Sequence, residues 1–62
     1  MASALSVEDL ESVWEQLAVA IDRAGPTRDR LFLAKLAVLL ANALGDRTAV
    51  ERLIDAALAD LE

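Results

Sequence analysis

The sequence predicts an all-α fold: a three-helix unit, made of a helical hairpin plus a third helix, that completes its core by dimerisation. Two dipeptides, Gly25-Pro26 and Gly45-Asp46, combine a helix-stop signal with a helix-start residue and divide the 62-residue chain into three segments. Apolar residues recur at helical spacing in these segments, and no stretch alternates with the period of two expected of a strand. We therefore expect a single domain over residues 1–62, with helices at about 7–24, 28–44 and 47–61.

The first helix is predicted to begin after Ser6, a good N-cap residue, with Asp9 three residues later in the position of a capping-box acid. Leu5 and Leu10 are spaced to form a hydrophobic staple across this helix start. Val19 is the only large apolar residue that departs from the amphipathic pattern of the segment. The main apolar face follows steps of three and four and comprises Val7, Leu10, Trp14, Leu17, Ile21 and Ala24.

The second segment is apolar around most of its circumference. From Leu31 to Leu44, 12 of 14 residues are apolar, and the two exceptions, Lys35 and Asn42, share a narrow stripe with Arg28. A membrane span needs about 20 apolar residues, so a run of this length indicates a buried core helix. We expect the bulky side of this helix to hold the other two helices; that side contains Phe32, Leu36, Leu40 and Ala43.

The third helix can begin at Asp46, or at Thr48 with Glu51 completing a capping box. One face of the segment is apolar and comprises Val50, Leu53, Ile54, Ala57, Leu58 and Leu61. Polar residues, with Asp60 and Glu62 at the end, lie outside this stripe. This pattern is typical of a helix that packs through one side only.

Charge excludes several classes of function. Eleven acidic residues against six basic ones give a net charge of −5 and a pI near 4.4, which argues against binding to nucleic acid or to an anionic membrane.

The absence of Cys excludes disulfides and thiolate zinc sites. The first residues lack the basic and long apolar regions of a secretory signal, so we expect a cytoplasmic protein. The bases of the middle segment, Arg28, Arg30 and Lys35, are predicted to pair with acids of the flanking helices.

A chain of this size and mean hydropathy, +0.40, has more apolar surface than one small core can hide. Covering that surface with another protein is the usual remedy. The sequence therefore predicts association of the chain with itself, as a homodimer, and a larger protein is a further candidate partner.

The run from Leu31 to Asp46, LFLAKLAVLLANALGD, resembles the short bacterial all-helical proteins of domain of unknown function family 2783. The similarity extends from about Val7 to Leu61 and includes the L-A-N-x-[LI]-G-D ending, here Leu40 to Asp46. Many members carry His where this chain has Ala43. The resemblance implies an accessory role beside enzymes rather than an activity of the chain itself.

Residue types suited to catalysis are scarce. The chain has no His, Cys or Tyr, and its serines, Ser3, Ser6 and Ser12, lie in or near the predicted start of the first helix. Glu11 and Glu15 are spaced to share a hard cation, but carboxylates on a polar helix face usually stay solvated. We therefore expect no catalytic residues, no cofactor and no metal site.

The second helix also supplies the predicted interface between subunits. Small residues on its less bulky side allow close approach of another helix, and polar residues border them; the candidate interface comprises Leu31, Ala34, Lys35, Val38, Ala41 and Asn42. Asn42 either faces water or forms a hydrogen bond across a helix seam. Trp14 and Phe32, the two aromatic residues, are predicted to lie in the core rather than to anchor an interface.

These observations predict a small acidic protein-interaction module without catalytic activity, either homo-oligomeric or an accessory subunit of an enzyme. The alternative is a small carrier or sensor that binds an apolar small molecule inside the helical bundle. An interaction module requires an exposed apolar face, whereas a carrier requires an enclosed cavity.

Overall fold

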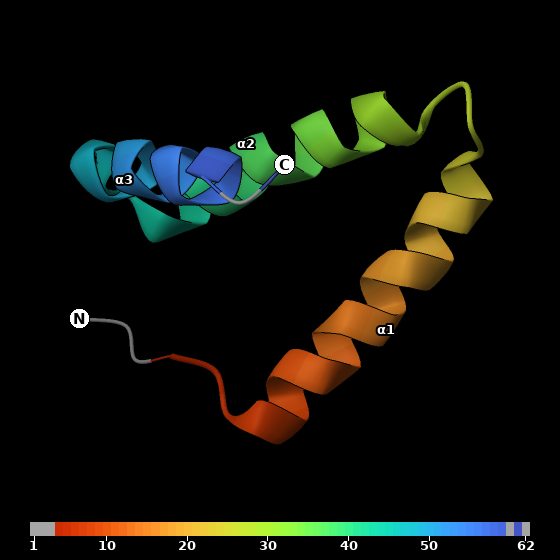
Figure 1. The fold of residues 1–62 in the computed structure, drawn as a ribbon, viewed down its shortest axis with the longest axis horizontal. Helices are drawn as coiled ribbons and strands as arrows, with labels where there is room; N and C mark the ends of the chain where they lie inside the picture. Colours follow the sequence, from red (N-terminus) through yellow and green to blue (C-terminus); the bar gives the residue numbers. More distant parts are fainter. Residues whose placement is uncertain (1–3, 60, 62) are drawn as a thin grey trace.

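A computed structural model describes residues 4–59 and 61 of the chain. These residues form three helices, α1 (Val7–Ala24), α2 (Asp29–Leu44) and α3 (Arg47–Ala59), joined by two short turns (Figure 1). No strand is present in the described part of the chain. The predicted all-α class and the predicted division into three segments are confirmed.

The start of α1 and the turn after it follow from local hydrogen bonds. The Ser6 hydroxyl oxygen accepts a hydrogen bond of 3.1 Å from the Asp9 backbone N–H, as predicted for the N-cap. Gly25 ends the helix with φ +82°, a value that glycine adopts readily, and its N–H donates to the Ile21 carbonyl oxygen. The Asp29 N–H then donates to the Gly25 carbonyl oxygen at 2.9 Å, which closes the turn into α2.

The turn between α2 and α3 is tighter. Gly45 adopts the left-handed conformation, with φ +70° and ψ +24°, and its N–H donates to the Ala41 carbonyl oxygen at 3.0 Å. An Asp46 carboxylate oxygen accepts from the Ala49 N–H at 3.1 Å and caps α3. Of the two predicted starts, the structure therefore supports the one at Asp46, which caps α3, and the helix itself begins at Arg47.

We expect Gly45→Ala to lower the free energy of unfolding by about 1 kcal/mol, because an L side chain is strained at this positive φ. An added Cβ would lie 4.0 Å from the nearest atom, the Asn42 carbonyl oxygen, so strain and not a clash is the cause. Gly45→Asn is the matched control, since Asn tolerates this conformation better than Ala. Urea titration followed by circular dichroism measures both, and equal stability of the Ala variant and the unsubstituted protein would contradict the assignment.

Helix α2 is the central element. It meets α1 beside the Gly25 turn, and its C-terminal part packs along α3, whereas α1 and α3 make no contact with each other among the described residues. Figure 1 shows α1 running away from the other two helices, so that its N-terminal half stands free. Nearly all contacts therefore join residues that are close in the sequence.

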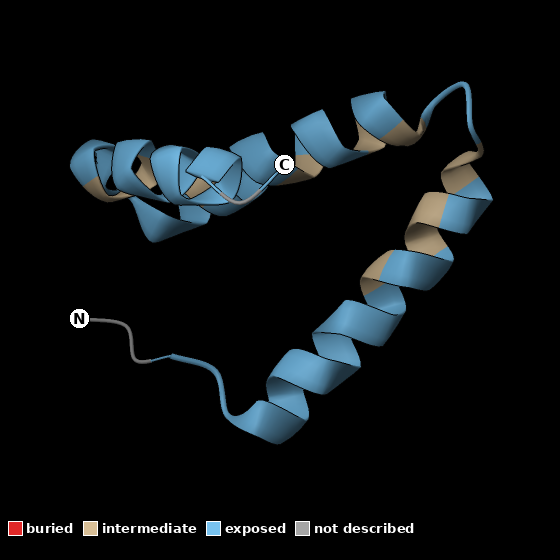
Figure 2. Ribbon diagram, in the orientation of Figure 1, coloured by how far each residue is buried: buried red, intermediate tan, exposed pale blue. Residues whose placement is uncertain are grey.

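Burial is shallow everywhere in the described residues. None of them is buried, and the half-buried ones gather at two places, the α1–α2 corner and the contact of α2 with α3 (Figure 2). Phe32 and Leu36 are half-buried at the corner. Leu40, predicted to lie in the core, is 59% exposed in the single chain.

Trp14 was predicted to be a core residue, and for the single chain this prediction is wrong. Its side chain is 74% exposed. The helical period identifies Trp14 as part of the apolar face of α1, but α2 reaches only the C-terminal half of that face. The N-terminal half consequently remains in contact with solvent.

Two helix boundaries differ from those predicted. Helix α2 begins at Asp29 and not at residue 28, because Arg28, with φ −125° and ψ −1°, lies outside helical geometry. Helix α3 ends at Ala59, and Leu61 is not helical. Ser3, Asp60 and Glu62, considered above, lie outside the described residues. No helix in the described ranges combines the length and the apolar character that crossing a bilayer requires.

Candidate interaction surface

The most prominent feature of the surface is its area. The accessible surface of the chain is 5988 Å², whereas a folded monomer of 6.6 kDa is expected to expose about 3,900 Å². The excess is about 2,000 Å², and large apolar side chains are exposed on all three helices. Monomeric proteins rarely expose contiguous apolar patches larger than a few hundred Å². The exposed faces of the helices are therefore the candidate functional site.

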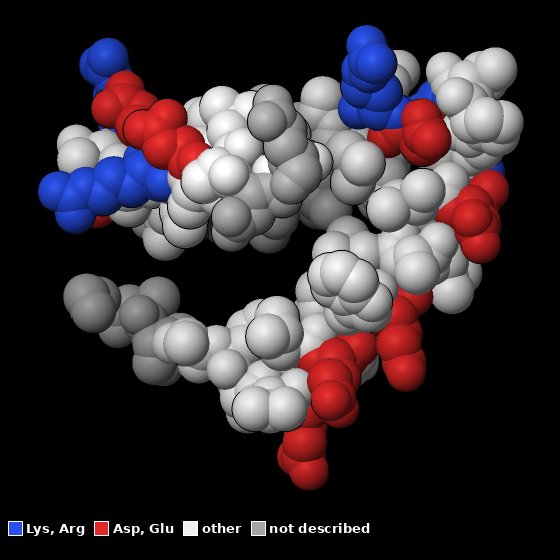
Figure 3. Space-filling model, viewed as in Figure 1, with Lys and Arg blue, Asp and Glu red and all other residues white. Residues whose placement is uncertain are grey.

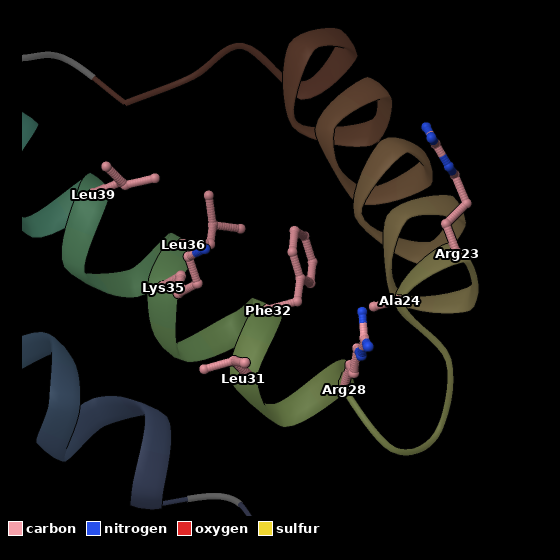
Figure 4. Close-up of a pocket in the computed structure, with 8 residues that line it drawn as sticks. All are labelled: Arg23, Ala24, Arg28, Leu31, Phe32, Lys35, Leu36 and Leu39. Atoms are coloured by element: carbon pink, nitrogen blue, oxygen red, sulfur yellow. The ribbon is translucent and has the colours of Figure 1, made fainter.

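The first part of this site is a groove of about 410 Å³ where α1 turns into α2, here called the corner groove. Figure 4 shows Phe32 and Leu36 projecting from α2 into the space beside α1, with Arg28 next to Ala24 at the turn. The full lining is Arg23, Ala24, Arg28, Leu31, Phe32, Lys35, Leu36 and Leu39.

The corner groove combines an apolar floor with positive charge. Arg23, Arg28 and Lys35 contribute three cationic groups, and no acidic side chain lines the groove in the described part of the chain. Among the described residues, none of these cations forms an ion pair, and the only pair joins Arg47 to Glu51 within α3, at 2.9 Å between Nε and Oε2. The predicted pairing of Arg28, Arg30 and Lys35 with acids of the flanking helices is thus wrong for the described residues of one chain. Four of the five acids of α1 lie in its N-terminal half, which diverges from α2, and Glu51 of α3 pairs within its own helix.

The second part lies on the free half of α1 and is here called the Trp14 face. It comprises Leu10, Glu11, Trp14 and Glu15, which surround a shallow hollow of about 500 Å³. Leu10 is 55% exposed, and Trp14 is more exposed still. Figure 3 shows that acidic side chains gather along α1. This face therefore combines a large aromatic side chain with negative charge, the opposite sign to the corner groove.

A third apolar hollow, of about 430 Å³, follows the seam between α2 and α3. Every residue that lines it is apolar, including Leu40 and Leu44 from α2 and Leu53 and Ile54 from α3. Both α3 residues remain more than half exposed. The contact between these two helices thus leaves apolar area open to solvent.

The predicted interface residues of α2 are divided among these hollows. Leu31 and Lys35 line the corner groove, and Ala34 and Val38 lie with Lys35 around a further shallow apolar hollow. Val38, Ala41 and Asn42 border the turn into α3. Ala41 is half-buried and also lines the α2–α3 seam, whereas Asn42 is exposed. Helix α3 therefore covers one edge of the predicted strip.

The two described serine hydroxyl groups are engaged in local hydrogen bonds. The Ser6 hydroxyl is engaged as the N-cap of α1, and the Ser12 hydroxyl accepts a hydrogen bond of 3.1 Å from the Gln16 side-chain amide. Within residues 4–59 and 61, no three acidic side chains are grouped so that they could hold a metal ion.

Arg23 is a charged residue of the corner groove that the helical pattern of the sequence does not single out. It lies in the last turn of α1, and the Gly25 turn places it on the same groove as Arg28. The signal in the sequence was the presence of bases on both sides of the Gly-Pro turn.

No family model, no curated protein and no solved structure matches this chain. The resemblance to domain of unknown function family 2783 stays a prediction.

Proposed function

We propose that this chain is a small protein-interaction module without catalytic activity of its own, which completes its core by associating with itself. The observation that carries the proposal is the accessible surface, which exceeds that of a folded monomer of this mass by about 2,000 Å². Association is the physical means by which such a surface leaves water.

The apolar hollows also bear on the alternative functions. A carrier of an apolar small molecule would hold its ligand in an enclosed cavity, whereas the hollows described above are open at the surface. Open faces on helices favour a protein occupant. An accessory role on a larger enzyme would use the same faces, and the self-associated state would then compete with that docking.

We expect sedimentation at micromolar concentration to give about twice the monomer mass of 6.6 kDa, with dissociation on dilution. Helicity should fall together with the mass, because the single chain has no buried core among its described residues. Circular dichroism over the same dilution series measures this. A helical, cooperatively melting monomer at all concentrations would overturn the proposal.

A further inference from the structure

We infer that the occupant of the corner groove is the Trp14 face of a second copy of this chain. Each copy places its Trp14 face in the corner groove of the other. This inference rests on the proposed self-association and specifies which surfaces meet. It follows from the charge, the shape and the area of the two faces.

Charge is the first argument. The corner groove carries Arg23, Arg28 and Lys35 with no acid, and none of the three has an ion-pair partner among the described residues. The Trp14 face carries Glu11 and Glu15 with no base. Facing patches of opposite sign steer association and fix its register, whereas patches of like sign oppose it.

The apolar parts of the two faces are also complementary. The corner groove has a floor of Leu31, Phe32, Leu36 and Leu39, and Leu39 is 65% exposed. Trp14 is the largest exposed side chain on α1, at 74%. A Trp that enters an apolar pocket rimmed by charge is typical of the energetic centre of an interface.

Geometry prevents a chain from using both faces on itself. The Trp14 face lies two or more helical turns before Arg23, the α1 residue that lines the groove, and Figure 1 shows α1 projecting away from α2 over this part. A second copy related by a two-fold axis supplies a Trp14 face for each groove, so that both contacts form at once.

The area fits a second copy as well. An excess of about 2,000 Å² on each of two chains corresponds to a total interface of about 4,000 Å², within the range of obligate homodimers. This excess is spread over all faces of the chain, and the two contacts would cover the part of it that lies on α1 and on the corner groove.

Charge reversal tests the pairing. The first variant, Glu11→Arg with Glu15→Arg, makes the Trp14 face basic, and the second, Arg28→Glu with Lys35→Glu, makes the corner groove acidic. Each variant alone places like charges against each other at both contacts, and we expect its dimer Kd to rise by about a hundredfold. Mixed in equal amounts, the two variants should form a heterodimer, because both of its contacts then join opposite charges.

Matched controls change the net charge by the same amounts on α3. The two control variants lie outside both faces; they are Glu51→Arg with Asp55→Arg, and Arg47→Glu with Arg52→Glu. Each should shift the dimer Kd by less than about tenfold. Native mass spectrometry and sedimentation measure homodimers and heterodimers for all four variants.

The outcomes separate this inference from the proposed function. A heterodimer that forms only between the two reversed variants supports the pairing. If the unsubstituted protein dimerises while the reversed variants dimerise equally well, or fail to recover on mixing, the pairing is wrong and self-association uses another face. Open-ended oligomers would also overturn the reciprocal contact. A monomeric unsubstituted protein would overturn both proposals.

Discussion

Leu36→Asp is expected to abolish both the helical fold and self-association. Leu36 is half-buried against α1 and forms part of the corner groove, where a second copy would bury it further. Burying an unpaired carboxylate costs several kcal/mol, while a domain of this size has a total stability of about 3 to 5 kcal/mol. Circular dichroism should show loss of helicity at concentrations where the unsubstituted protein is folded.

Asn42→Asp is the control for the Leu36 substitution. It adds the same charge to the same helix at an exposed position, so its effect should be limited to a few tenths of a kcal/mol from the helix dipole. If Leu36→Asp kept the helicity and the melting temperature of this control, Leu36 would not belong to the core of either the chain or the dimer.

Trp14→Ala should weaken the dimer by at least about thirtyfold, because removing a central aromatic anchor typically costs 2 kcal/mol or more. The helix itself should persist in the folded protein, since Trp14 contributes little packing within one chain, where it is 74% exposed. Sedimentation at several concentrations measures the change in Kd.

The unsubstituted protein offers an independent readout of the same side chain. Trp14 is the only Trp and there is no Tyr, so fluorescence reports this residue alone. Its emission should shift to shorter wavelength as concentration rises and the indole leaves water. Val19→Ala is the control for the Ala variant, because Val19 is exposed on another side of α1 and should leave the Kd unchanged. Equal Kd values for the two variants would contradict a role for Trp14 as an anchor.

The elements of the fold were predictable because their signals are local. Ser6, Gly25 and Gly45 act within one turn of the chain, and the bounds of α1 follow from them directly. The angle between α1 and α2 was not predictable, since it depends on backbone geometry in a four-residue turn. Because of that angle, Phe32 is half-buried whereas Trp14 is 74% exposed. Helical periodicity identifies an apolar face but does not identify what covers it.

The sequence predicted what kind of surface the candidate site has, but only some of the residues that form it. The excess of apolar residues predicted exposed apolar faces, and two of the predicted interface residues, Leu31 and Lys35, line the corner groove. The corner groove also needs Arg23 and Ala24 from α1, which no pattern within a single helix can bring together with them.

The local character of the contacts has a consequence for how the protein is made and maintained. Because α1 meets α2, and α2 meets α3, only between neighbours along the chain, the helices can form quickly with little loss of loop entropy. On the proposal above, burial of the apolar faces waits for an encounter between two molecules, which is a second-order event. The folded fraction then depends on the amount of protein synthesised, and chains in excess of any larger binding partner remain stable only while they are abundant enough to find each other.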